Sequence, residues 1–190
     1  MLKNFYIFRN GQSSYNLDGR LQGQSNDSVL TDTGISQAIN AANYLKDKQI
    51  EVIISSPQRR AKQTGCIISK QLKAPIYYDS RLVEANIGHF DGAIINKLSK
   101  KHRQTLSLWQ HEKSELTRFE NGESKQEIRS RLIAALKQYA DSPCQNIAIS
   151  SHNFSILEIL QSLHIKKDNI LNGEVIHLQY DGSQWNYIQQ

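Results

Sequence analysis

The sequence predicts an α/β fold: a three-layer sandwich with a mostly parallel central sheet, helices on both faces and a C-terminal hairpin at the sheet edge. Three short apolar runs, at residues 4–8, 51–56 and 146–152, each end in a polar cluster. Short runs of β-branched and aromatic residues between turn formers are typical of strands buried on both faces. Helical patterns lie between these runs, and this alternation is typical of a parallel sheet covered on both sides.

The first helical pattern spans residues 31–48, and Thr31 or Thr33 is expected to cap its N-terminus. Its apolar residues fall on one stripe at helical spacing, namely Ile35, Ala38, Ile39, Ala42 and Leu45. The same periodicity predicts further helices over residues 59–72, 124–140 and 154–163. The inward face of the helix over residues 124–140 is predicted to comprise Ile128, Leu132, Ala135, Leu136 and Tyr139.

The C-terminal residues 173–190 show a different pattern, because two β-rich runs flank the turn sequence DGS. This pattern predicts a terminal hairpin at a sheet edge. The polar segment at about residues 93–123 is expected to form a helical insert that covers the open end of the sheet. A chain of 190 residues, 38% of them hydrophobic, is long enough for a single domain with a sizeable core.

Composition indicates a cytoplasmic protein without a membrane segment. The first residues, MLKNFYIF, lack the pattern of a secretion signal, and no stretch is long enough to span a bilayer. Cys66 and Cys144 lie far apart, and we expect buried or idle thiols rather than a disulfide or a zinc site. The formal charge of +5 permits attraction to phosphates, but no aromatic residues alternate with the basic ones, which argues against nucleic-acid binding.

Polar residues follow each of the three predicted strands. Ligands of open parallel sheets bind beyond the carboxyl ends of the strands, and Arg9, Arg60 and His152 fall at those ends. Arginine can hold a phosphoryl group through two parallel hydrogen bonds. The three side chains therefore predict a site for phosphate or another compact oxyanion. No metal or other cofactor is expected, because these residues supply positive charge and no carboxylate cluster has ligand spacing.

An ordered set of motifs extends from residue 4 to about residue 187: RNGQSSYN, LQGQSNDSVLTDTGISQA, SSPQRRAKQT, RLVEANIGHFDG, NGES and ISSHN. In this order they resemble the histidine phosphatase superfamily, which includes the phosphoglycerate mutases and related small phosphatases. At 190 residues the chain is more similar to the compact phosphatases than to the longer cofactor-dependent mutases. The resemblance implies that the partner is a small phosphorylated metabolite or phosphate.

The resemblance also implies roles for individual residues. Arg9 and Arg60 match the arginines of the family's phosphate pocket, and His152 matches its second histidine. Asn16 matches a pocket asparagine, and Glu84 matches the proton donor of the phosphatase and mutase members.

Asn10 falls at the position of the family histidine that accepts the phosphoryl group. An amide nitrogen shares its lone pair with the carbonyl and cannot attack phosphorus, although an amide can preserve the shape of the pocket. The resemblance therefore predicts a protein that binds a small phosphomonoester with its covalent chemistry disabled. Three alternatives stay open: direct hydrolysis by water that Glu84 activates, an engineered His-to-Asn form of an active phosphatase, or a non-enzymatic interaction module with a vestigial pocket.

Further departures from the family pattern accompany Asn10. Asn153 and Phe154 follow His152, where the family often has glycine, and Ile87 stands where an aromatic residue is usual. His89 is expected to be an ordinary loop histidine. The insert carries basic residues that are expected either to contact a second anionic group or to form a solvated face: Lys97, Lys100, Lys101, His102, Arg103 and Lys113.

Overall fold

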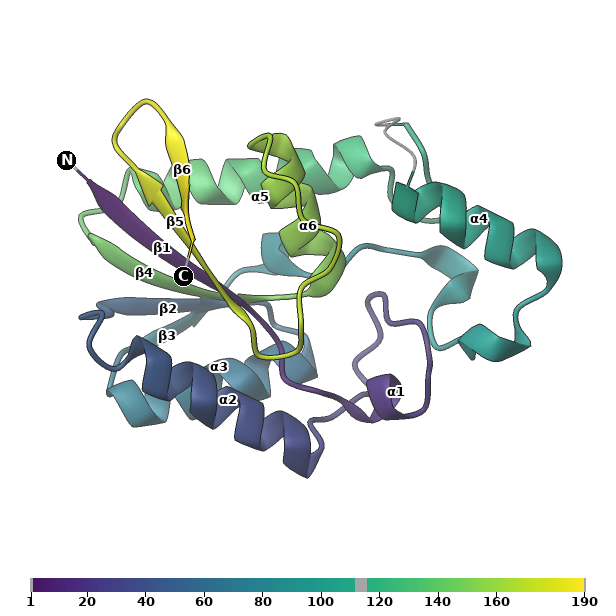
Figure 1. Cartoon of the computed structure of the whole chain (residues 1–190), viewed down its shortest axis with the longest axis horizontal. Helices are drawn as coiled ribbons and strands as arrows, with labels where there is room; N and C mark the ends of the chain where they lie inside the picture. Colours follow the sequence, from purple (N-terminus) through teal and green to yellow (C-terminus); the bar gives the residue numbers. More distant parts are fainter. Residues whose placement is uncertain (1, 112–115, 190) are drawn as a thin grey trace.

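A computed structural model describes residues 2–111 and 116–189 of the chain (Figure 1). Within these residues a six-stranded sheet has the strand order β3-β2-β4-β1-β5-β6. The strands are β1 (Lys3–Arg9), β2 (Val52–Ser55), β3 (Ile76–Tyr78), β4 (Asn146–Ser151), β5 (Val175–Tyr180) and β6 (Trp185–Ile188). The first four are mutually parallel, whereas β5 runs antiparallel to β1 and pairs with the edge strand β6. The predicted mostly parallel sheet and C-terminal edge hairpin are confirmed.

Helices cover both faces of this sheet. The α-helices are α1 (Ser14–Leu17), α2 (Asp32–Leu45), α3 (Arg59–Leu72), α4 (Lys100–His111), α5 (Lys125–Ala140) and α6 (Asn153–Ser162). Figure 1 shows α2 and α3 on one side of the strands and α5 and α6 on the other. Alternate residues of β1 serve the two layers: Phe5 and Ile7 pack with the α5 and α6 residues, while Tyr6 and Phe8 pack with those of α2 and α3. The three-layer prediction is therefore confirmed.

Side chains cap the N-termini of two of the predicted helices. Thr31 precedes α2, and its Oγ1 accepts a hydrogen bond from the Gly34 amide at 3.1 Å. Ser124 precedes α5 and forms a capping box with Glu127. The inward face predicted for α5 is buried as expected, from Ile128 to Tyr139. Of the helices that the structure describes, none is long and apolar enough to cross a membrane.

The apolar stripe predicted on α2 is partly wrong. Ile35 and Ile39 are each 41% exposed, and the buried residues of the helix are Gly34, Ala38, Ala41, Ala42 and Leu45. The physical reason is close approach, because a Cβ atom at Gly34 would lie 2.0 Å from the Gln12 carbonyl oxygen. Only small side chains fit on the face of α2 that meets the loop after β1, so the two isoleucines point to solvent.

The insert at residues 93–123 contains a short 3-10 turn, η3 (Ile95–Lys97), and then α4. Trp109 holds α4 to the core: it is 2% exposed and packs against Phe119 and Phe154 at ring-centroid distances of 5.0 and 4.6 Å. The basic residues of the insert from Lys97 to Arg103 are exposed, as a solvated face would be, and Lys113 lies outside the described residues.

Two short elements were not predicted. Strand β3 and helix α1, with three and four residues, are too short for periodicity to predict them. Both cysteines are free, as expected for idle thiols; Cys66 is exposed and Cys144 is half-buried.

The topology positions the carboxyl ends of three strands at one edge of the sheet. β4 lies between β1 and β2, with Arg9 paired to Ser151 and Ser55 paired to Ser150. The residue that follows β4 therefore stands between the residues that follow β1 and β2. This edge contains the side chains considered next.

Candidate anion-binding site

His152 lies at the centre of this edge. It is the N-cap residue of α6 and is only 1% exposed. Its Nδ1 lies 3.2 Å from Asn10 Oδ1, and its Nε2 lies 2.8 Å from Ser56 Oγ. Burial lowers the pKa of His152 well below its usual value, and the positive charges of Arg60, Arg131 and Arg9 lower it further. The imidazole is therefore neutral at pH 7.

Arg60 lies in the first turn of α3 and is 2% exposed. Its Nη1 donates to the Ser25 carbonyl at 3.0 Å and its Nη2 to the Gly23 carbonyl at 2.9 Å. Burial lowers its pKa to about 10, against the opposing effects of the Glu84 and Asp91 carboxylates, and the charge of Arg9 lowers it further. The guanidinium stays protonated at neutral pH, but its charge is poorly solvated.

Arg9 is the last residue of β1, and its Nη1 donates to the Ile170 carbonyl. Burial lowers its pKa, and the Glu84 and Glu174 carboxylates oppose that shift. In the part of the chain that the structure describes, neither Arg9 nor Arg60 forms an ion pair with a carboxylate. Two cations and a neutral imidazole thus share one edge, and their charges influence one another.

Asn10 is 3% exposed and is held by both its main chain and its side chain. Its amide N–H donates to the Ser151 carbonyl at 3.0 Å, and its Nδ2 donates to the Gly11 carbonyl at 2.9 Å. Gly11 is needed here, because a Cβ atom at this position would lie 2.3 Å from the Gly34 carbonyl oxygen. The Asn10 side chain is therefore fixed between this loop and His152.

Asn16 lies on α1 and is linked to Asn10 through Asn172. Its Oδ1 accepts hydrogen bonds from the Ser13 amide and hydroxyl, each at 3.0 Å, and from Asn172 Nδ2 at 3.3 Å. Asn172 Nδ2 also donates to the Asn10 carbonyl at 3.0 Å. Asn172 thus links the two asparagines, and sequence reasoning did not identify it.

Glu84 is buried beside the same loops, at 4% exposure, and its carboxylate faces the N-terminus of α6. Oε1 accepts from the amides of Ala85 and Ser155, both at 2.9 Å, and Oε2 accepts from the Phe154 amide at 3.1 Å. Helix N-termini attract carboxylates in this way. The carboxylate therefore serves as a hydrogen-bond acceptor in this conformation.

Two residues that sequence reasoning missed hold Glu84 in place. Gln58 Oε1 accepts from the Glu84 amide at 2.6 Å, and Arg131 Nη2 donates to the Glu84 carbonyl at 3.2 Å. Arg131 in turn bonds the Glu123 carboxylate at 2.8 Å. Gln58 lies within the SSPQRR motif, which is the one signal that pointed toward it.

Other predicted residues lie away from these contacts. His89 is exposed, and its Nε2 lies 2.8 Å from Asn121 Nδ2. Ile87 is buried at 1% exposure, and Asn153 Oδ1 accepts from the Ile170 amide at 3.1 Å. Asn153 thereby fixes the residue whose carbonyl binds Arg9. No group of three or more His, Cys, Asp or Glu side chains that could hold a metal ion occurs in residues 2–111 and 116–189.

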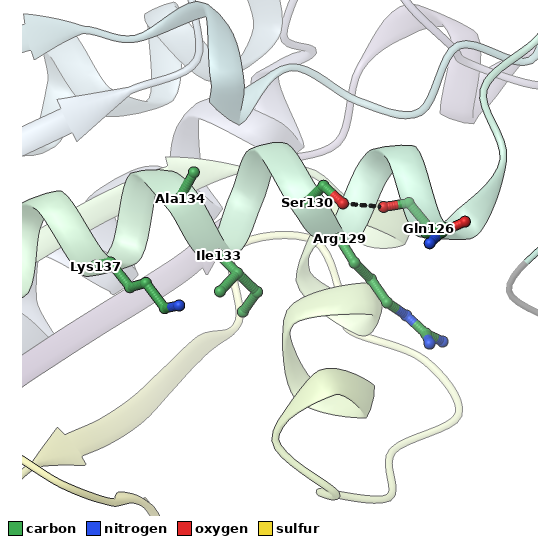
Figure 2. Close-up of a pocket in the computed structure, with 6 residues that line it drawn as sticks. All are labelled: Gln126, Arg129, Ser130, Ile133, Ala134 and Lys137. Carbon is green, nitrogen blue, oxygen red and sulfur yellow. Dashed lines mark hydrogen bonds between the residues drawn. The ribbon is translucent and has the colours of Figure 1, made fainter.

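Two cavities lie on the helices rather than at this edge. One, of about 480 Å³, runs along α5 and is lined by residues that Figure 2 labels from Gln126 to Lys137. The other, of about 860 Å³, lies between Trp109 of α4, Lys125 and the outer face of α6. Neither is lined by Arg9, Arg60 or His152.

Residues 5–189 match the profile of the histidine phosphatase superfamily, branch 1. The chain belongs to this superfamily. "Putative phosphoserine phosphatase 2" of Hydrogenobacter thermophilus is 29% identical, over all of this chain and 96% of that protein. "Probable phosphoglycerate mutase GpmB" of Escherichia coli is 36% identical, over 73% of this chain and 63% of that protein.

Solved structures of the same fold superpose on almost the whole chain. A mycobacterial glucosyl-3-phosphoglycerate phosphatase in complex with VO₃ gives a TM-score of 0.87 at 22% identity, covering 98% of this chain and 97% of that one. YhfR of Bacillus stearothermophilus gives a TM-score of 0.88 at 21% identity, covering 99% and 96%. At this identity the superpositions establish the fold alone.

Proposed function

We propose that this protein binds a small phosphomonoester or inorganic phosphate between Arg9, Arg60 and His152. The observation that carries the proposal is the pair of guanidinium groups without a carboxylate partner among the described residues. Buried charges are normally paired, so a site that leaves two cations unpaired favours an anionic ligand. A phosphoryl dianion supplies both the charge and the acceptors that two arginines require.

The family and its members support this ligand class. The chain belongs to the histidine phosphatase superfamily, and one solved member of the fold is a phosphatase in complex with VO₃. The same mycobacterial phosphatase has also been solved with inorganic phosphate. Compact tetrahedral or trigonal oxyanions are therefore suitable probes for this chain.

We propose further that Asn10 occupies the position of the family nucleophile, so that no phosphohistidine forms. Covalent phosphoryl transfer needs an unshared lone pair aimed at phosphorus. The Asn10 amide offers none, and both of its polar atoms are engaged, Nδ2 with Gly11 and Oδ1 with His152. We assign Glu84 to the same site as its acid–base group, because it is buried and its charge acts on both Arg9 and Arg60.

The experiment compares the unaltered chain with Asn10→His. Calorimetric titration with orthovanadate measures binding, and p-nitrophenyl phosphate measures turnover. We expect both proteins to bind vanadate, the unaltered chain to turn over near the buffer rate, and Asn10→His to gain about 10³-fold, since loss of a nucleophile typically removes that much or more. A matched control is Asn10→Ala, which should gain no turnover.

Two outcomes would contradict the proposal separately. Vanadate binding absent from the unaltered chain rules out the pocket. Turnover by the unaltered chain at the level of Asn10→His rules out the loss of chemistry while leaving the pocket intact.

A further inference from the structure

A short loop segment, residues 23–25, lies between two side chains of opposite charge. Its carbonyl groups face Arg60, because Nη2 donates to the Gly23 carbonyl at 2.9 Å and Nη1 donates to the Ser25 carbonyl at 3.0 Å. Its amide groups face Asp91, because Oδ1 accepts from the Gly23 amide at 3.0 Å and Oδ2 accepts from the Ser25 amide at 2.7 Å. The 23–25 segment therefore binds a cation through its oxygens and an anion through its nitrogens.

The 23–25 segment lies close against the loop that carries Asp91. A Cβ atom at Gly23 would lie 2.7 Å from Ile87 Cγ1 and 3.2 Å from Asp91 Oδ2, so glycine permits this approach. The Gly23 carbonyl also accepts from Gln58 Nε2 at 2.9 Å. Hydrogen bonds to an ionised carboxylate are stronger than those between neutral groups, so the two bonds to Asp91 hold the amide side of the segment firmly.

This arrangement leaves part of the Arg60 guanidinium available to a ligand. A guanidinium carries more N–H donors than the two that bond the 23–25 segment, and Arg60 makes no other side-chain hydrogen bond to the described residues. Burial lowers the pKa of Arg60, and the carboxylates of Glu84 and Asp91 oppose that shift. Asp91 thus favours the charged form of Arg60 through an intervening loop, without occupying the N–H groups that a phosphoryl oxygen requires.

We propose that Asp91 is a positioning residue for the anion site: it holds the amides of the 23–25 segment, whose carbonyls hold the Arg60 guanidinium with its remaining N–H groups open to a phosphoryl oxygen. The fixing of Arg60 rests on the hydrogen bonds alone, whereas its consequence for anion binding rests on the proposed function. Neither the motifs nor the family resemblance assigned a role to Asp91.

The first test measures the mobility of Arg60 in the unaltered chain, without any ligand. NMR spectra of ¹³C,¹⁵N-arginine-labelled protein distinguish a guanidinium whose Nη groups rotate rapidly from one whose rotation is slow. Through-bond correlations to the main chain identify the signals of Arg60. We expect slow rotation, with separate resonances for Nη1 and Nη2. Rapid averaging of the two would overturn the proposal, and this result needs no variant at Asp91 to fold.

The second test replaces the carboxylate. Asp91→Asn keeps the size of the side chain but removes its charge and one of its two acceptors. It should speed Nη rotation at Arg60 and weaken the binding of inorganic phosphate by about fivefold to tenfold, as loss of one charge-assisted hydrogen bond would. Removal of a nearby negative charge by itself would instead strengthen the binding of an anion. Unchanged or tighter phosphate binding in calorimetric titration therefore overturns the positioning role.

Asp181→Asn is the matched control. Asp181 Oδ1 also accepts from two main-chain amides, those of Ser183 and Gln184, both at 2.8 Å. Asp181 follows β5, whose last residue pairs with the first residue of β1, so it lies at the opposite end of β1 from Arg9. The control should change neither Nη rotation at Arg60 nor phosphate affinity. An equal effect of both variants would show that the response is not specific to Asp91.

The two readouts separate the positioning role from the proposed function. If the unaltered chain does not bind phosphate, the proposed function is wrong, while the Nη rotation in the unaltered and Asp91→Asn chains still decides whether Asp91 fixes Arg60. Weaker phosphate binding with unchanged rotation overturns the positioning role, because Asp91 would then act on the site by another route.

Discussion

Two arginine sites in this protein have opposite electrostatic environments: Arg60 is buried, whereas the Arg81 side chain is 32% exposed. At the proposed anion site, Arg60 donates to the main-chain carbonyls of Gly23 and Ser25, and burial lowers its pKa to about 10. At the anchor cluster, formed by Asp79, Arg81 and Tyr139, the guanidinium of Arg81 bonds both oxygens of Asp79. The hydrogen bonds that Arg81 donates to the Asp79 carboxylate raise the pKa of Arg81 above its usual value. The positive charge of Arg60 thus has no directly bonded carboxylate among the described residues, whereas that of Arg81 has one. We call the first arginine under-compensated and the second compensated.

Under the proposed function, this difference separates arginines that serve the fold from arginines that serve a ligand. Two other, largely buried arginines also have carboxylate partners: Arg129 bonds Glu158 at 2.7 Å and Arg131 bonds Glu123 at 2.8 Å. Desolvating a cation without a close counter-ion is unfavourable, so the two hydrogen bonds that Arg60 donates to main-chain carbonyls offset only part of that cost. An anion that binds there supplies the missing partner.

The largest expected effect comes from replacing the under-compensated arginine. Arg60→Met should weaken vanadate binding by about 100-fold, because two charge-assisted hydrogen bonds contribute roughly 1.5 kcal/mol or more each. The free energy of unfolding should stay within about 1 kcal/mol or rise, since an apolar side chain of similar volume needs no counter-ion. Titration calorimetry and urea unfolding measure the two quantities.

Arg81→Met is the matched control, with the reverse pattern. It leaves vanadate affinity unchanged and lowers the free energy of unfolding by about 1–2 kcal/mol, because the Asp79 carboxylate loses its main donor. If the two variants behave alike in both assays, the distinction between ligand-serving and fold-serving arginines is wrong.

The sequence predicted the proposed anion-binding residues but not the residues that hold them in place. Arg9, Arg60 and His152 could be placed together because a buried parallel strand followed by a polar residue has a visible pattern. Gln58 and Asn172 have no such pattern, since they act only after separate loops meet at the sheet edge. Ser56 directly follows β2 and does fit the pattern, but the sequence does not indicate that its hydroxyl meets His152. The burial of Ile35 and Ile39 was predicted wrongly for a related reason. Periodicity identifies the apolar face of a helix, but it does not show how closely the neighbouring backbone approaches that face.

The second prediction is that the folded protein loses stability in acid because of His152. Unfolded His152 takes up a proton near pH 6.5, whereas the buried ring resists protonation until a much lower pH. Below about pH 6.5 the unfolded chain binds a proton at His152 that the folded chain does not. The free energy of unfolding therefore keeps its full value above about pH 6.5 and falls below it, by up to about 1.4 kcal/mol per pH unit. His152→Gln should flatten this part of the stability curve in urea unfolding.

His177→Gln is the control for this experiment. Burial and the charge of Lys48 lower the pKa of His177 as well, but it is only partly buried, at β5 beside Tyr6. His177→Gln should reduce the dependence of the free energy of unfolding on pH by less than His152→Gln does. Equal slopes in His152→Gln and the unaltered chain would mean that His152 is not held neutral.

The smallest effect is expected at the anchor cluster and lies in a different pH range. Burial tends to raise the pKa of Asp79, but hydrogen bonds from Arg81 and Tyr139 outweigh it and lower the value to about 2. A depressed carboxyl pKa gives stability that is present above pH 3.8 and is lost as pH falls toward about 2. Because the pair is partly open to solvent, Asp79→Asn should lower the free energy of unfolding by only about 1 kcal/mol at pH 7.

The two pH ranges make the comparison testable in one titration. Asp79→Asn should remove the loss of stability below pH 3.8 and leave the loss below pH 6.5 intact, whereas His152→Gln should do the reverse. Added vanadate should shift the stability of Asp79→Asn as much as that of the unaltered chain, because the anchor cluster has no part in anion binding. A smaller shift in Asp79→Asn would show that the compensated arginine also supports the ligand, through the Arg131 contacts to the Arg81 and Val83 carbonyls.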